Sequence, residues 1–164
     1  MPILAFGSYD TQEQLNKLID QLCALEKDNK LMTSKEIIKS SEASRQIVLN
    51  SSLDPEIRIK ANLVYSGFLG IYAQKNLSKK HGKEAFHALK ENFSFSSDNK
   101  VAALAYANAV IFISHKGWIV RKLISSGLGI DLEAELNTAK IHLLKFQKDN
   151  LVNSKIDELN KIYL

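Results

Sequence analysis

Apolar residues recur at three- and four-residue spacing along most of this sequence, and that spacing predicts helices. The clearest stripe consists of Leu132, Leu136, Ala139, Leu143 and Phe146. These residues follow one helical face without interruption, so we expect one continuous helix there rather than a helix-turn-helix. Only two prolines and seven glycines occur among 164 residues, fewer than a chain of many tight turns needs. The sequence therefore predicts an all-α fold, with strand-like alternation confined to residues 3–6.

Polar residues with capping chemistry indicate where several of these helices begin. Residues 33–36, TSKE, match the capping box, in which the first and last side chains bond each other's backbone N–H groups. Asp54 suits an N-cap and Pro55 the first helical position, and Asp10 with Glu13 gives a similar start signal. The expected helices span about 11–27, 34–49, 55–75, 79–92, 98–115, 118–126, 131–146 and 154–164. Short connections between seven or eight helices favour antiparallel neighbours within one domain, residues 1–164.

A run of almost uninterrupted apolar residues, 101–113, lies past the middle of the chain. It is shorter than the roughly 20 residues of a membrane-spanning helix, so we predict a central packing helix and no membrane insertion. Asn108 is the one polar residue in the run, and we expect it to be buried. Its amide would then bond a neighbouring helix, at Ser66 or at a backbone carbonyl, or contact a ligand. Gly67 and Gly70 lower helix propensity, and we expect close helix packing to offset that loss.

The charge balance of the chain is mild. It has 22 basic and 18 acidic residues, a net charge of +4 and a pI near 9.1. A dedicated nucleic-acid binder concentrates more charge on one face, although this sign permits an acidic partner. Cys23 is the only cysteine, so an internal disulfide is excluded and an oxidising compartment is not indicated. No signal-peptide pattern opens the sequence, and we expect a cytoplasmic protein.

No motif in the sequence assembles a catalytic or metal-binding set. His81, Glu84 and His87 share one helical face, but a di-iron bundle needs further Glu and His residues at matching spacing, which do not occur. We interpret these three residues as a solvated polar face. Cys23 lies among apolar neighbours without an identifiable base, and the glycine patterns of phosphate-binding loops and nucleophile elbows are absent. The sequence therefore predicts a protein that is not an enzyme, with no metal and no cofactor.

Part of the chain has the residue spacing of a helical repeat. In one helix pair Leu69-Gly70 is followed by Ala85-x-x-x-Leu89, and a second pair has large, small and apolar residues at matching positions. This pattern resembles the tetratricopeptide repeat (TPR), in which a Leu-Gly pair lets a second helix pack closely. The two repeat-like pairs span 55–93 and 98–126.

The resemblance to tetratricopeptide repeats is partial, because Ser66 and Ala73 replace the expected Trp and Tyr and the closing proline is absent. It implies a TPR-like α-superhelix, and an irregular helical bundle is the alternative architecture. It also implies a concave binding surface lined by the first helix of each pair. The residues that it places toward that surface are Gln74, Lys75, Ser114 and His115.

We predict a non-enzymatic adaptor, regulator or scaffold that binds a partner peptide or helix in a groove between helices. Aromatic side chains are the expected anchors, because they dominate the energetics of many interfaces. The candidate partner-binding residues are Tyr65, Tyr72, Gln74, Lys75, Tyr106, Asn108, Ser114, His115 and Trp118.

Three alternatives to a protein-binding adaptor stay open. One is a binder of nucleic acid or of another acidic partner, since basic residues near an aromatic ring suit phosphate and base contacts. The candidate basic face consists of Lys79, Lys80, Lys83, Lys116, Arg121 and Lys122. The second is an enzyme whose residues come together only in three dimensions, and the third is a homo-oligomeric structural protein.

Overall fold

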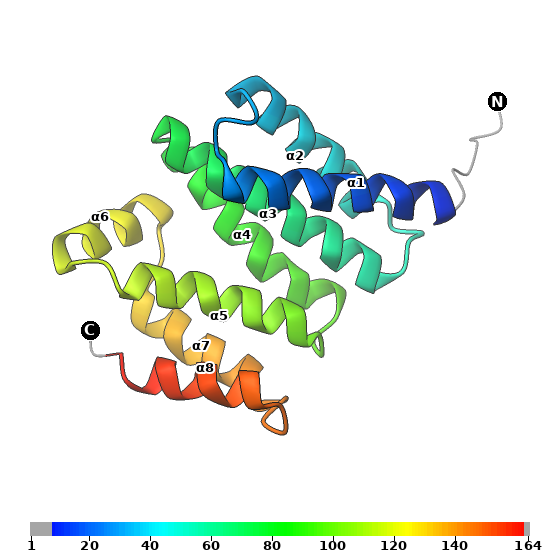
Figure 1. Cartoon of the computed structure of the whole chain (residues 1–164). Helices are drawn as coiled ribbons and strands as arrows, with labels where there is room; N and C mark the ends of the chain where they lie inside the picture. Colours follow the sequence, from blue (N-terminus) through cyan, green and yellow to red (C-terminus); the bar gives the residue numbers. More distant parts are fainter. Residues whose placement is uncertain (1–7, 163–164) are drawn as a thin grey trace. The chain divides into compact units, whose positions relative to one another are not determined.

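A computed structural model of the chain describes residues 8–162, apart from the side chains of residues 8, 9, 118 and 119. Within these residues the fold is all-α, as the apolar spacing predicts, and contains eight helices. In chain order they are α1 (Ser8–Lys27), α2 (Ser34–Leu49), α3 (Pro55–Asn76), α4 (Lys79–Phe95), α5 (Lys100–Ser114), α6 (Trp118–Leu128), α7 (Leu132–Leu144) and α8 (Asn150–Asn160) (Figure 1). Residues 3–6, where the sequence has a strand-like pattern, lie outside the described residues.

The predicted capping chemistry sets the starts of α2 and α3. Thr33 and Glu36 form the complete capping box of α2, and the Asp54 side chain accepts from the Glu56 backbone N–H at the start of α3. The predicted start signals are wrong at both ends of the chain. Asp10 lies inside the first turn of α1 rather than at its cap, and α8 begins four residues before the predicted position, because Asp149 caps it.

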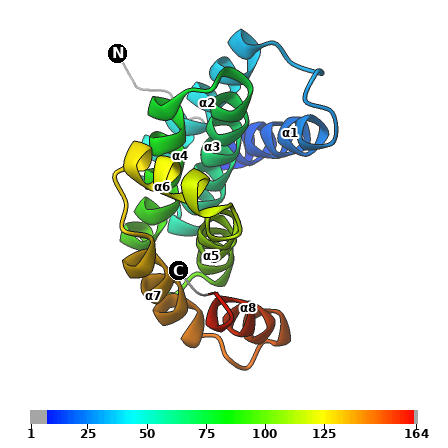
Figure 2. The ribbon, with the colours of Figure 1, turned by 90° about the vertical axis from the view of Figure 1, so that its left-hand side faces the viewer.

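The chain divides into two compact units, one ending at Ala88 and the other beginning at Leu89. The boundary lies within α4, which contributes its first part to one unit and its last part to the other. In the first unit α2 packs extensively on α3, whereas α1 contacts α3 and α2 more sparingly (Figures 1 and 2). In the second unit α5 packs chiefly against α7 and α8, and only slightly against α6.

Buried polar side chains join α3 to the first part of α4. The Asn62 amide donates to the Ala88 carbonyl at 2.7 Å, and the Ser66 hydroxyl donates to the Ala85 carbonyl at 2.8 Å. These bonds satisfy polar groups that would be costly to bury unpaired. Ser66 is therefore engaged with α4 and is not the partner of Asn108.

The two α3 glycines differ in their surroundings. A Cβ at Gly67 would lie 2.6 Å from a methyl carbon of Leu22, so this glycine does permit α1 to approach α3 closely, as predicted. A Cβ at Gly70 would meet nothing within 4 Å, so the prediction of close packing at Gly70 is wrong. The Leu-Gly pair of the repeat-like pattern therefore does not admit a neighbouring helix here, and the tetratricopeptide resemblance stays a prediction.

The apolar run 101–113 forms α5, the packing centre of the second unit. Its small residues Ala102, Ala103 and Ala107 are fully or almost fully buried, so neighbouring helices approach closely. One side of α5 nevertheless faces solvent: Val101 and Phe112 are more than half exposed, and Asn108 lies between them in an exposed position. The prediction that Asn108 is buried is therefore wrong, because seven-residue spacing places it on the same side of the helix as Val101.

Candidate functional site

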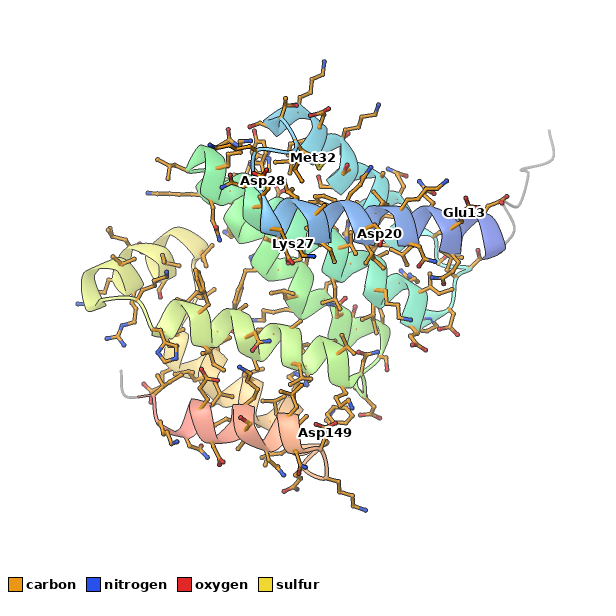
Figure 3. All side chains as sticks on the ribbon, in the orientation of Figure 1. Glu13, Asp20, Lys27, Asp28, Met32 and Asp149 are labelled. Atoms are coloured by element: carbon orange, nitrogen blue, oxygen red, sulfur yellow. The ribbon has the colours of Figure 1, made fainter. Side chains whose placement is uncertain are left out.

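A groove of about 510 Å³ opens between α1 and α2 in the first unit. Its lining includes two small apolar residues, Ala24 from α1 and Ala43 from α2, and Leu31, which also lines it, is 59% exposed. Figure 3 shows Met32 just beyond the end of α1, in the connection that borders this groove. The lining residues are Leu18, Gln21, Ala24, Leu31, Met32, Glu36, Lys39, Ser40 and Ala43.

The groove exists because small side chains on α1 and α2 leave the space between the two helices unfilled. Ser40 bridges it at one point, where its hydroxyl donates to the Gln21 side-chain oxygen at 3.2 Å. Ser41 and Ser44 are buried instead and donate to backbone carbonyls of their own helix. The serines of α2 therefore serve two purposes, because Ser40 lines the groove while Ser41 and Ser44 are packed in the core.

Two sets of polar contacts hold the connection that presents Leu31 and Met32. The Lys75 ammonium donates to the backbone carbonyls of Asn29 at 3.2 Å and Met32 at 2.9 Å. The Thr33 backbone N–H donates to the Glu36 carboxylate at 2.7 Å, and this bond, with that from the Thr33 hydroxyl, lowers the pKa of Glu36. Both contacts fix the backbone on either side of Met32, so the apolar edge of the groove is pre-formed.

Lys39 gives the groove a positive charge at its polar side. Its ammonium makes no hydrogen bond or ion pair with any described residue. The acidic neighbour Glu36 is already engaged by the capping box. An acidic group on a ligand in the groove would therefore find a cation that the protein itself does not neutralise.

The predicted partner-binding residues of the first unit lie around other parts of its surface. Tyr65 is half-buried, with the Arg45 guanidinium 5.3 Å from its ring centroid, and it lines a separate groove of about 240 Å³. Tyr72 is half-buried against the His81 ring, 4.5 Å between centroids. Gln74 and Lys75 are exposed and line a third groove, of about 360 Å³, between α1 and α3.

Two predicted contact residues of the second unit are buried in the structure. Tyr106 is fully buried, and Ser114 is buried with its hydroxyl donating to the Val110 carbonyl of its own helix. Asn108 and His115 are exposed, and the His115 Nε2 lies 3.3 Å from a Glu158 carboxylate oxygen. The Trp118 side chain lies outside the described residues. Tyr106 and Ser114 lie on the buried face of α5.

The residues of the predicted basic face belong to both units. Lys79, Lys80 and Lys83 are exposed on α4 in the first unit. The second unit contains Lys122, which is exposed, and Lys116 and Arg121, which are half-buried. The Lys116 ammonium lies 4.1 Å from the centroid of the Phe112 ring.

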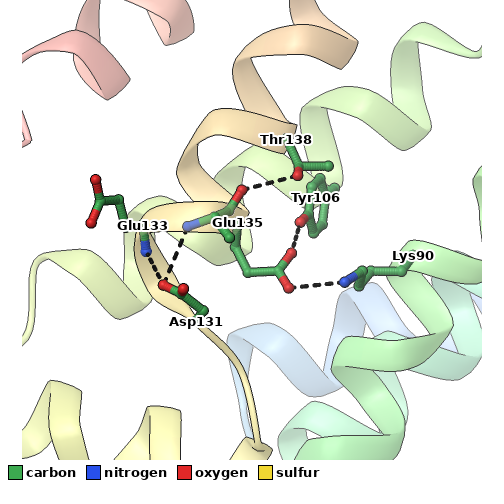
Figure 4. A network of polar contacts seen from close by, with 7 residues as sticks. Lys90, Tyr106, Asp131, Glu133, Glu135 and Thr138 are labelled. Carbon is green, nitrogen blue, oxygen red and sulfur yellow. Dashed lines mark hydrogen bonds and ion pairs between the residues drawn. The ribbon is translucent and has the colours of Figure 1, made fainter.

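A buried carboxylate organises the core of the second unit. Glu135, 7% exposed, accepts from the Tyr106 hydroxyl and from the Lys90 ammonium, the latter at 2.9 Å (Figure 4). Burial and the Glu135 carboxylate raise the pKa of Tyr106, so its hydroxyl keeps the proton that it donates. This network joins the end of α4, the middle of α5 and the start of α7 and has a structural role.

An aromatic stack lies next to this carboxylate network. The His142 imidazole lies parallel to the Phe93 ring, 3.6 Å between centroids, and Phe93 meets the Tyr106 ring edge-on at 5.6 Å. The His142 Nδ1 is buried without a hydrogen-bond partner among the described residues. Burial lowers the pKa of His142, and the Lys145 charge lowers it further, which favours the neutral ring.

No family model matches this chain, and neither the curated proteins nor the solved structures gave a match. Within residues 8–162, no helix is both long enough and apolar enough to span a bilayer. The same residues contain no group of three or more His, Cys, Asp or Glu side chains placed to hold a metal ion.

Sequence reasoning missed the groove between α1 and α2. Its signal was present in the segment KDNKLMTSKE, where Leu31 and Met32 stand between polar residues just before a capping box. Two large apolar side chains in a short polar connection are exposed unless something covers them. Glu135 was missed as well, because a glutamate in the first turn of a helix is typically a surface residue that complements the helix dipole.

Proposed function

We propose that this protein is a non-enzymatic interaction module whose α1–α2 groove binds an amphipathic helical segment of a partner protein. The observation that carries the proposal is the pre-formed groove of about 510 Å³ with Leu31 exposed at its edge. Exposed apolar surface of this kind stabilises a complex by about 25 cal/mol per Å² when a partner covers it.

The shape of the groove favours a helix as its occupant. Both walls are helices that contact α3, and the residues that line them include the small Ala24 and Ala43. A third helix can therefore insert large side chains between them, as in recognition by a helix-accepting groove, with anchors at i, i+3 or i+4, and i+7. Lys39 favours an acidic residue on that helix, beside its apolar stripe.

The connection at the edge of the groove is already ordered, and this favours tight binding. Ordering a loop on binding lowers affinity, and here Lys75 and the capping box already hold the connection between α1 and α2. Lys75, a predicted contact residue, would on this proposal act as a positioning residue. Its substitution by methionine should weaken binding without removing a direct contact.

Selection of peptides provides the test. A displayed library of amphipathic helical peptides would be panned against the full chain, and selected peptides would be titrated by calorimetry. Ala43→Leu places a larger side chain in the groove and should raise the Kd of these peptides by about tenfold or more. Ala134→Leu, at an exposed position on α7, is the matched control and should leave the Kd unchanged.

Two outcomes would overturn the proposal. The first is a selection that yields no peptide with saturable binding. The second is a set of peptides that bind the Ala43→Leu chain as tightly as the unaltered chain, which would place their site elsewhere. Circular dichroism of each variant shows whether the helical fold is retained.

A further inference from the structure

α6 contributes little to the core of its unit. Among its residues 120–128 no side chain is buried, and Val120 and Leu123 are 45% and 65% exposed. α6 packs only slightly against α5. A helix of 11 residues is too short to be stable in water without tertiary support, so this apolar surface suits a further partner.

The segment around α6 is also one-sided in charge. Residues 115–130 contain no Asp or Glu but include Lys116, Arg121 and Lys122, so they carry a formal charge of +3. The partner that complements this segment is therefore anionic.

The exposed side of α6 combines both properties. Val120 and Leu123 are three residues apart and lie on one side of the helix, where both are exposed. Lys122 and Ser126, four residues apart, are exposed beside them. An apolar strip next to a cationic strip is the pattern of helices that lie in the interface of a membrane. The sequence places Trp118, a residue type enriched at membrane interfaces, at the start of this helix.

We propose that α6 binds the surface of an anionic lipid bilayer without crossing it. Val120 and Leu123 enter the boundary between headgroups and acyl chains, and Lys116 and Lys122 lie at the level of the anionic headgroups. Phe112, 52% exposed in the last turn of α5, adds apolar surface near the same segment. The cytoplasmic leaflet of a cell membrane contains anionic lipids and is a surface of this kind.

A bilayer fits this surface better than nucleic acid or an acidic protein does. Two exposed side chains of α6, Val120 and Leu123, are aliphatic, and aliphatic side chains neither stack on bases nor bond phosphates. A stable protein complex needs roughly 800 Å² per partner with matched shape, which a short helix with two exposed aliphatic residues does not supply. A bilayer needs no shape complementarity, because lipids adapt to the side chains.

Vesicle binding tests the proposal on the full chain. The probes are vesicles of phosphatidylcholine alone and of phosphatidylcholine with phosphatidylserine, and the readouts are co-sedimentation and the emission of Trp118, the only tryptophan. We expect partition into the phosphatidylserine vesicles with a blue shift, and little into neutral ones. Lys116→Gln with Lys122→Gln should weaken partition by about 30-fold, roughly fivefold per charge, and Leu123→Gln by about tenfold.

Matched variants on the first unit serve as controls. Lys30→Gln with Lys35→Gln removes the same charge, and Leu49→Gln removes an apolar side chain that is 57% exposed. Both should partition as the unaltered chain does. Equal, weak binding to the two kinds of vesicle would overturn the proposal. So would binding to a DNA duplex that depends on Lys116 and Lys122 but not on Leu123, because that pattern indicates a nucleic-acid surface. Neither result bears on the α1–α2 groove.

Discussion

Replacing Tyr106 by phenylalanine removes one hydroxyl from the core of the second unit and leaves the ring in place. That hydroxyl donates to the Glu135 carboxylate, whose side chain is only 9% exposed. The remaining partner, Lys90, has a side chain that is 42% exposed and therefore screened by solvent. The substitution thus leaves one carboxylate oxygen buried without the donor that faces it.

The magnitude follows from the chemistry of that bond. A hydrogen bond to a charged acceptor contributes about 1.5–3 kcal/mol, and the lost donor is not replaced by water in a buried site. We therefore expect Tyr106→Phe to lower the free energy of unfolding of the second unit by about 2 kcal/mol. For a unit of this size the melting temperature should fall by about 10 °C.

Urea denaturation measures this loss. Trp118 lies in the second unit and is the only tryptophan, so its fluorescence reports on that unit, while circular dichroism follows all helices. Tyr72→Phe is the matched control in the first unit, because the Tyr72 hydroxyl makes no hydrogen bond with a described residue. It should leave the Trp118 transition unchanged.

A double-mutant cycle isolates the pair. In a Glu135→Leu chain the carboxylate is gone, so Tyr106→Phe should be neutral or stabilising there, and the coupling between the two positions should be about 2 kcal/mol. The reasoning is refuted if Tyr106→Phe has the same effect in both backgrounds, because the hydroxyl would then not be stabilised by Glu135.

Two further predictions concern stability. Gly70→Ala should raise the free energy of unfolding by up to about 1 kcal/mol, and with it the melting temperature, because a Cβ there meets nothing. Gly67→Ala should raise the melting temperature less or lower it, since its Cβ would meet Leu22. Thermal melts that ranked the two variants the other way would contradict this expectation. The pKa of His142 lies below the 6.5 of an exposed histidine, so the unfolded chain binds its proton at higher pH than the fold does. Stability should therefore be full above about pH 6.5 and fall as pH drops toward the folded pKa. His142→Phe should abolish that fall, as measured by urea midpoints across this range; a slope that persists would assign it to another group.

The helices could be predicted from the sequence because their signals are local. The capping box at Thr33 and Glu36, and the apolar stripe from Leu132 to Leu143, act within a few residues of each other and need no tertiary information. The start of α8 was missed because Asp149 follows a connection with no apolar periodicity, so nothing marked it as a cap.

The candidate site depended on facts that the local pattern does not contain. Which side of α5 is buried is decided by α7 and α8, so the sequence could not show that Tyr106 turns inward and Asn108 outward. The groove exists because small side chains on α1 and α2 leave space between the two helices. A small residue such as Ala43 can lie at a close helix contact or can line a groove. Only the arrangement of the helices decides which of the two occurs.

The methyl NMR signal of Met32 tests the binding groove most directly. The chain has two methionines, Met1 and Met32, so labelling their methyl groups gives few signals, of which that of Met32 comes from the groove. Titration with a selected helical peptide should shift the Met32 signal with the Kd found by calorimetry, and the shift should disappear in the Ala43→Leu chain. A Met32 signal that stays unchanged while the peptide is fully bound would contradict the account.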